Sequence, residues 1–211
     1  MLVYDHSFAR RKEHKLHIVE KLSSPFSDVG SIPTASTKFK RQKMEEKFIN
    51  YDNYLKNHKE NVLKAFNLLY DKVNACIFNF QGLSRQELEK QILAHDDSKR
   101  TKEEYEFYAD YFFGERTESV KEKFKIASDV HKSRNPHHPE YWEKNGVISM
   151  PDRYLFEMLC DWWSFYLVSG KPEDIFDWYK KEGKKFVFCK ENQDKIDKTF
   201  NTIKEICNTK E

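Results

Sequence analysis

The amino-acid sequence predicts an all-α protein. Apolar residues recur every three or four positions through most of the chain after residue 44, which is the spacing that aligns them on one face of a helix. Ser84 with Glu87, and Thr101 with Glu104, have the spacing of capping boxes, which begin helices. No stretch alternates apolar and polar residues over the length of a strand.

The composition favours one folded domain without a membrane or nucleic-acid partner. Aromatic residues make up 15% of the 211 residues and supply a large buried surface although the hydrophobic content is only 38%. Lys+Arg 37 against Asp+Glu 35 leaves a formal net charge of +2, so no strong field attracts nucleic acid or anionic lipid. No apolar run reaches the roughly 20 residues that span a bilayer, and the four cysteines form no Cys-x-x-Cys pair. We therefore expect a cytoplasmic protein with reduced thiols.

The N-terminal segment differs from the rest of the chain. Residues 1–43 are rich in histidine, lysine and serine, lack apolar periodicity and are interrupted by prolines. We therefore expect a disordered tail over 1–43, followed by a folded domain over 44–211. The segment 29–37, Val-Gly-Ser-Ile-Pro-Thr-Ala-Ser-Thr, resembles the translation of a transfer-RNA gene from its T-arm to its CCA end. This resemblance predicts that the native coding sequence begins at Met44.

Two helices are expected in the first part of the folded domain. The first covers residues 45–80, and its apolar face carries His58. Gln81-Gly82 breaks the pattern, and the capping box at Ser84 begins the second helix.

The second helix leads into the sequence His-Asp-Asp-Ser-Lys at residues 95–99. His95 shares the apolar face of the helix and is expected to point inward, with Asp96 beside it near the helix end. Lys99 lies one turn beyond His95. Because an imidazole next to a carboxylate suits a first-row divalent ion, this segment is the first candidate for a metal site.

The third and fourth helices are separated by Gly114. The third is expected to follow the second capping box and to carry an aromatic face, and Gly114 ends it. The fourth begins at about residue 118 and places His131 at the inner end of its apolar face. Pro136 ends this helix, because the residue before a proline disfavours the helical conformation.

A histidine pair follows in a loop. His137 and His138 lie between two prolines in the segment 135–142, Asn-Pro-His-His-Pro-Glu-Tyr-Trp. Prolines stiffen the loop and limit where the two imidazoles can point. Such rigidity is costly unless the positions of the imidazoles matter.

Three more helices complete the chain, which makes about five to seven in all. The fifth covers residues 152–168 and places Asp161 among aromatic and aliphatic residues, where an unpaired carboxylate is expensive. Two amphipathic helices follow over 173–181 and 190–208.

The polar residues on these inner faces predict a metal site when they are taken together. A single histidine on an apolar face is more often a hydrogen-bonded core residue than a ligand. Burying seven ionisable groups without a compensating cation, however, would cost several kcal/mol. Imidazole and carboxylate ligands suit a divalent transition metal, Mn, Fe, Co, Ni or Zn, as one or two ions. The candidate ligands are His58, His95, Asp96, His131, His137, His138 and Asp161.

The order of these residues resembles the HD-domain superfamily of metal-dependent phosphohydrolases, which are all-helical. The resemblance covers roughly residues 51–168 and implies an HD-domain-like helical bundle. For a first ion it implies the ligands His58, His95, Asp96 and Asp161. The branches that hold two ions imply that Asp96 bridges both and that His131, with His137 or His138, binds the second.

Further details refine the resemblance. Lys99 matches the lysine of the His-Asp-x-x-Lys form, which implies a contact with a substrate phosphate. The segments Asn-Pro-His-His-Pro-Glu-Tyr-Trp and Asp-Trp-Trp look like an uncharacterised HD-like family of bacteria and their phages. The gap from His131 to His137 is shorter than in cyclic-dinucleotide hydrolases, and no Gly-Tyr-Pro follows the pair, which argues against cyclic dinucleotides as substrates.

The expected activity is hydrolysis of a small phosphorylated substrate, a nucleotide in our first interpretation, through a metal-activated water. Asp96 would hold the nucleophile in line, and Lys99, with Arg134 or Lys132, would neutralise the phosphate. One alternative keeps the same ligands but holds two irons and activates oxygen, as some HD-type oxygenases do. The other is a non-catalytic helical binding protein with a structural metal.

Overall fold

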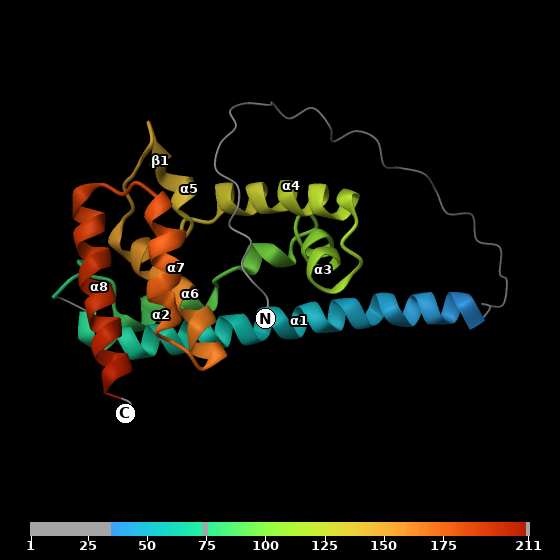
Figure 1. Ribbon diagram of the computed structural model, residues 1–211, viewed down its shortest axis with the longest axis horizontal. Coiled ribbons are helices and arrows are strands. Elements are labelled where there is room, and N and C mark those ends of the chain that lie inside the picture. Colours follow the sequence, from blue (N-terminus) through green and yellow to red (C-terminus); the bar gives the residue numbers. More distant parts are fainter. Residues whose placement is uncertain (1–34, 74–75, 210–211) are drawn as a thin grey trace. The chain divides into compact units, whose positions relative to one another are not determined.

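The computed structural model describes residues 35–73 and 76–209 and shows them to be predominantly helical (Figure 1). These residues form eight α-helices, two short 3₁₀ helices and one two-stranded hairpin. The prediction of an all-α fold is confirmed. The chain divides into two compact units, Met1–Gln42 and Lys43–Glu211, and the second unit contains the hydrophobic core and the candidate site.

The first helix differs from the expected one at both ends. α1 (Ala35–Val73) begins inside the segment that the sequence predicted to be disordered, because residues 38–43 include several strong helix formers. Residues 1–34, with most of the segment that resembles a transfer-RNA gene, lie outside the described residues. The helix ends before residue 80. Phe78 and Phe80 are buried, but they lie in a non-helical segment that follows the helix. Apolar residues at this spacing predict burial, but they do not establish where a helix stops.

The second helix begins as predicted and ends early. In α2 (Arg85–Leu93) the Ser84 hydroxyl accepts from the backbone N–H of Glu87, and the Glu87 carboxylate accepts from that of Ser84, which completes the capping box. His95 and Asp96 therefore lie in the turn between α2 and the 3₁₀ helix η1 (Asp97–Arg100), not on α2 itself.

The third and fourth helices pack against each other. α3 (Tyr105–Phe113) ends before Gly114, and α4 (Glu118–Arg134) is capped by Thr117 and ends before Asn135, as the sequence predicts. The second capping box is not formed. Glu104 precedes α3, and its carboxylate accepts hydrogen bonds inside the protein rather than from a helix N-terminus.

A short helix and a hairpin follow the histidine loop. α5 (Pro139–Trp142) is a single turn, and β1 (Glu143–Lys144) pairs antiparallel with β2 (Val147–Ile148). Asn145 and Gly146 connect the strands with φ of 53° and 78°, the left-handed values that tight hairpin turns require. Strands of two residues are too short to show alternation, which is why the sequence did not predict them.

The last three helices agree closely with the prediction. α6 (Asp152–Ser169) is buried along most of its length and packs against α7 (Asp174–Lys181) and α8 (Lys190–Asn208). The second 3₁₀ helix, η2 (Gly183–Lys185), lies in the connection between α7 and α8. None of the described helices has the length and apolar character needed to cross a membrane.

Candidate metal centre

Four predicted ligands from three parts of the fold converge in the interior. α1 contributes His58, the turn after α2 contributes His95 and Asp96, and α6 contributes Asp161. The Nε2 atom of His58 lies 3.1 Å from Oδ1 of Asp161, 3.3 Å from Nε2 of His95 and 3.4 Å from Oδ2 of Asp96. Nε2 of His95 lies 3.5 Å from each of the same two carboxylate atoms. All four residues are buried.

These spacings suit ligands of a single ion. Bonds of about 2.0–2.2 Å in tetrahedral or octahedral geometry separate neighbouring ligand atoms by about 2.8–3.6 Å. The separations between the imidazole nitrogens and the carboxylate oxygens, 3.1 to 3.5 Å, fall within that interval, as does the 3.3 Å between the two imidazole nitrogens. His58, His95 and Asp161 each offer a ligand atom within 4.8 Å of the others, so these three side chains could hold a metal ion. Oδ2 of Asp96 lies beside the two imidazoles of this group.

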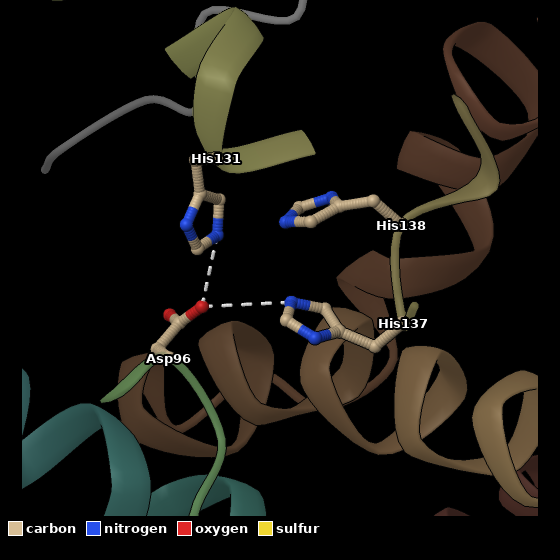
Figure 2. A group of neighbouring side chains, drawn as sticks. All are labelled: Asp96, His131, His137 and His138. Carbon is tan, nitrogen blue, oxygen red and sulfur yellow. Dashed lines mark ion pairs between the residues drawn. The ribbon is translucent and has the colours of Figure 1, made fainter. Parts of the chain in front are cut away.

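A second group of possible ligands shares Asp96. Figure 2 shows the Asp96 carboxylate facing His131 from α4 and His137 from the following loop, with the ring of His138 on the far side of the same space. Oδ1 of Asp96 lies 3.0 Å from Nε2 of His131 and 3.5 Å from Nε2 of His137. One ligand atom from each of the four residues can be chosen so that all lie within 4.8 Å of one another. The structure thus brings both loop histidines to this group.

Several of these atoms are buried without hydrogen bonds. Within the described residues, no hydrogen-bond partner is found for Oδ1 of Asp96, Oδ1 of Asp161 or the Nε2 atoms of His131, His137 and His138. Buried polar atoms are nearly always paired, and an unpaired one costs about 1–3 kcal/mol. Because their lone pairs face shared spaces, metal coordination would satisfy them together. These clusters of histidine and carboxylate could hold a metal ion.

Electrostatics keeps the two carboxylates ionised. Burial alone would raise the pKa of Asp96, but the charges of His95, Lys99 and His131 hold it well below its usual range. Burial alone would also raise the pKa of Asp161, but its contacts with His58 and His95 hold that pKa well below its usual range. Both carboxylates are therefore in the form that binds cations.

Among the histidines, burial and charge act in opposite directions. Burial would lower the pKa of His95, but the neighbouring Asp96 and Asp161 raise it well above its usual value. Burial lowers the pKa of His137 and of His138, and nearby histidines lower both further. The two loop histidines are therefore neutral, which is the form that coordinates a metal.

Two buried glutamates that the sequence analysis missed support the histidines. Oε1 of Glu157, on α6, lies 3.0 Å from Nδ1 of His95, and Oε2 of Glu104 lies 2.8 Å from Nδ1 of His131. Carboxylates in this position fix the orientation of metal-binding imidazoles. Glu157 lies one turn before Asp161 in a run of apolar residues, a pattern that could have revealed it. Glu104 was hidden by its interpretation as a helix cap.

Backbone conformation at Asp96 is part of the arrangement. Its φ of 60° and ψ of 16° lie in the left-handed region, which costs a residue with a side chain about 1–2 kcal/mol. Aspartate tolerates this conformation better than most residues. The sharp turn follows directly after His95 and lets two adjacent side chains face the same interior space.

The predicted phosphate contacts Lys99 and Arg134 lie in different surroundings. Nζ of Lys99 is buried, 2.6 Å from Oδ2 of Asp96 and 5.3 Å from the ring centre of Tyr108. Arg134 is at the surface, where its guanidinium lies 4.0 Å from the Glu103 carboxylate. Lys99 therefore belongs to the buried cluster, whereas Arg134 lies at the end of α4 outside the group of buried ligands.

Comparison with known proteins gives one result. No curated protein and no solved structure shows significant similarity to this chain. The model of a family of unknown function, DUF5662, matches residues 47–209. The match covers every histidine and carboxylate of the two ligand groups, so the buried cluster lies within the family domain. The chain belongs to this family of unknown function, DUF5662.

Proposed function

We propose that this protein is a metal-dependent phosphohydrolase of the HD type that holds two divalent ions and acts on a small phosphorylated substrate, such as a nucleotide. One observation carries the proposal: the two oxygens of Asp96 face different sets of ligands. Oδ2 lies beside His58 and His95, and Oδ1 lies beside His131 and His137. A carboxylate in this position suits a bridge between two neighbouring ions.

The roles of the residues follow from their placement. When bound, divalent ions lower the pKa of a coordinated water and stabilise charge on phosphoryl oxygens. Asp96 would contribute one carboxylate oxygen to each ligand group. Lys99 would offer its ammonium group to a phosphate, although in the structure this group pairs with Asp96. Because Lys99 is buried, water would screen little of the attraction between its ammonium group and a phosphate.

The test begins with protein purified without added metal. Elemental analysis should find close to two equivalents of Mn, Fe, Co, Ni or Zn per chain. Phosphate release should then be measured anaerobically over a panel of nucleotides and phosphomonoesters. Asp161→Asn should reduce hydrolysis at least 10²-fold while retaining the helical circular dichroism spectrum. Asp129→Asn, an exposed position on α4, is the matched control and should keep full activity.

Other outcomes identify the alternatives. Iron content with an oxygen-dependent optical change and no phosphate release would favour a di-iron oxygenase and contradict hydrolysis. A variant Asp161→Asn that unfolds, in a protein with bound metal but no turnover on the panel, would favour a structural metal. Retention of phosphate release by Asp161→Asn at the level of Asp129→Asn would also overturn the proposal.

A further inference from the structure

Glu157 contacts imidazoles from both ligand groups. Its Oε1 atom lies 3.0 Å from Nδ1 of His95 and 3.5 Å from Nδ1 of His137. Its Oε2 atom accepts a hydrogen bond of 2.5 Å from Nε2 of Gln91 on α2. The side chain is 6% exposed, so water screens these contacts little.

The other nitrogens of the two imidazoles point to different groups. Nε2 of His95 lies 3.3 Å from Nε2 of His58, within the first group. Nε2 of His137 lies 3.5 Å from Oδ1 of Asp96, within the second group. One carboxylate oxygen therefore faces one imidazole from each group. The ring centres of His95 and His137 are only 4.2 Å apart, so neither ring can turn without affecting the other.

Glu104 provides a natural comparison. Its Oε2 atom lies 2.8 Å from Nδ1 of His131 and accepts a hydrogen bond of 3.2 Å from Oγ of Ser98. His131 belongs to the second group alone. The chain thus has one buried glutamate directed at a single ligand group and another directed at both.

We propose that Glu157 is a shared positioning residue, which orients His95 for the first ion and His137 for the second and so couples the two ion sites. This inference rests on the two-ion arrangement of the proposed function. A proton on Nδ1 of each imidazole would face this carboxylate oxygen, at 3.0 Å for His95 and 3.5 Å for His137, which would leave each Nε2 lone pair free to coordinate. Loss of such a partner weakens metal binding by about 10- to 100-fold.

The test is calorimetric titration of metal-free full-length protein with Mn²⁺, which does not depend on activity. Wild type should bind two ions. Glu157→Ala should weaken both, each by about 10- to 100-fold, whereas Glu104→Ala should weaken only one. Glu157→Gln retains an acceptor oxygen and should recover part of the loss at both sites. If Glu157→Ala does not fold, Glu157→Gln alone should still weaken both ions relative to wild type.

The possible results separate this inference from the proposed function. The shared role would be overturned if the Glu157 variants bound only one of the two Mn²⁺ ions more weakly than wild type, or bound both as tightly as wild type. Binding of two Mn²⁺ by wild type without hydrolysis of any phosphate ester would instead overturn the proposed function and leave the role of Glu157 intact. Wild-type protein that binds no Mn²⁺ would overturn both.

Discussion

Oδ1 of Asp96 and Nε2 of His131 lie 3.0 Å apart, yet within the described residues neither atom makes a hydrogen bond. The atoms are close enough to interact, but an N–H on the imidazole nitrogen would not be aligned with the carboxylate oxygen well enough for a hydrogen bond. Two such buried atoms are stabilised if a cation lies between them. This relationship distinguishes a cluster that could bind metal from an ordinary buried network of hydrogen bonds.

Replacement of the central carboxylate should affect both ions. Asp96→Asn removes a negative charge from both groups and should reduce the metal content from two ions to one or none, with loss of hydrolysis. Elemental analysis after dialysis measures this. Asp97→Asn is the adjacent control, because Asp97 is exposed and forms a surface ion pair with Lys59. Its replacement should lower the free energy of unfolding by at most about 1 kcal/mol and should leave the metal content unchanged. Equal metal content in both variants would contradict the bridging role.

Metal removal should destabilise the folded protein. An ion that binds only the native state at 100 times its dissociation constant adds about 2.7 kcal/mol to the free energy of unfolding. For a chain of this size we expect a fall in Tm of roughly 5–10 °C when a chelator replaces Mn²⁺. Thermal unfolding followed by circular dichroism measures the change. Asp96→Asn should show little of this dependence, and a wild-type Tm unaffected by chelator would argue against native metal binding.

Lys99 should matter for turnover more than for metal binding. Lys99→Met removes the ammonium group beside Asp96 and keeps much of the side-chain volume. We expect hydrolysis to fall at least 10-fold while metal content is maintained, since a competing positive charge has been removed. Lys59→Met, at a partly exposed lysine, is the control. Loss of metal together with activity in Lys99→Met would show instead that the lysine supports the ligands.

The two loop histidines should contribute unequally. His137 is 4% exposed and lies 3.5 Å from both Asp96 and Glu157, whereas His138 is only partly buried. His137→Ala should therefore reduce Mn²⁺ affinity at the second site more than His138→Ala does. Parallel calorimetric titrations measure the difference. A larger loss in His138→Ala would make His138 the dominant ligand and His137 a residue that orients it.

Close packing beyond the site can be tested at Gly183. A Cβ atom added there would collide with the ring of Tyr179, which packs 4.4 Å from the ring centre of Phe200 on α8. Gly183→Ala should lower the free energy of unfolding by about 1–3 kcal/mol without changing metal content. Chemical denaturation measures the cost, with the exposed neighbour Lys184→Ala as control. A loss no larger than that of the control would show that the ring moves aside freely.

Local signals in the sequence determined most of the helices. The capping box at Ser84, the glycine at residue 114 and the proline at residue 136 act on their own backbone, so helix boundaries near them were predictable. The end of α1 was not, because the apolar residues through Phe80 fit a helix and a buried extended segment equally well. The short hairpin was missed for a similar reason, since two residues per strand carry no periodicity.

The candidate ligands also followed from the sequence, because each lies at a position that faces inward on its own helix or loop. Only the tertiary structure decided their grouping. The left-handed turn at Asp96 directs its two oxygens to different partners, and the packing of the helices brings Glu157 on α6 within 3.0 Å of Nδ1 of His95. These are relationships between residues more than 30 positions apart. No local pattern encodes them, because the distances depend on how the helices pack.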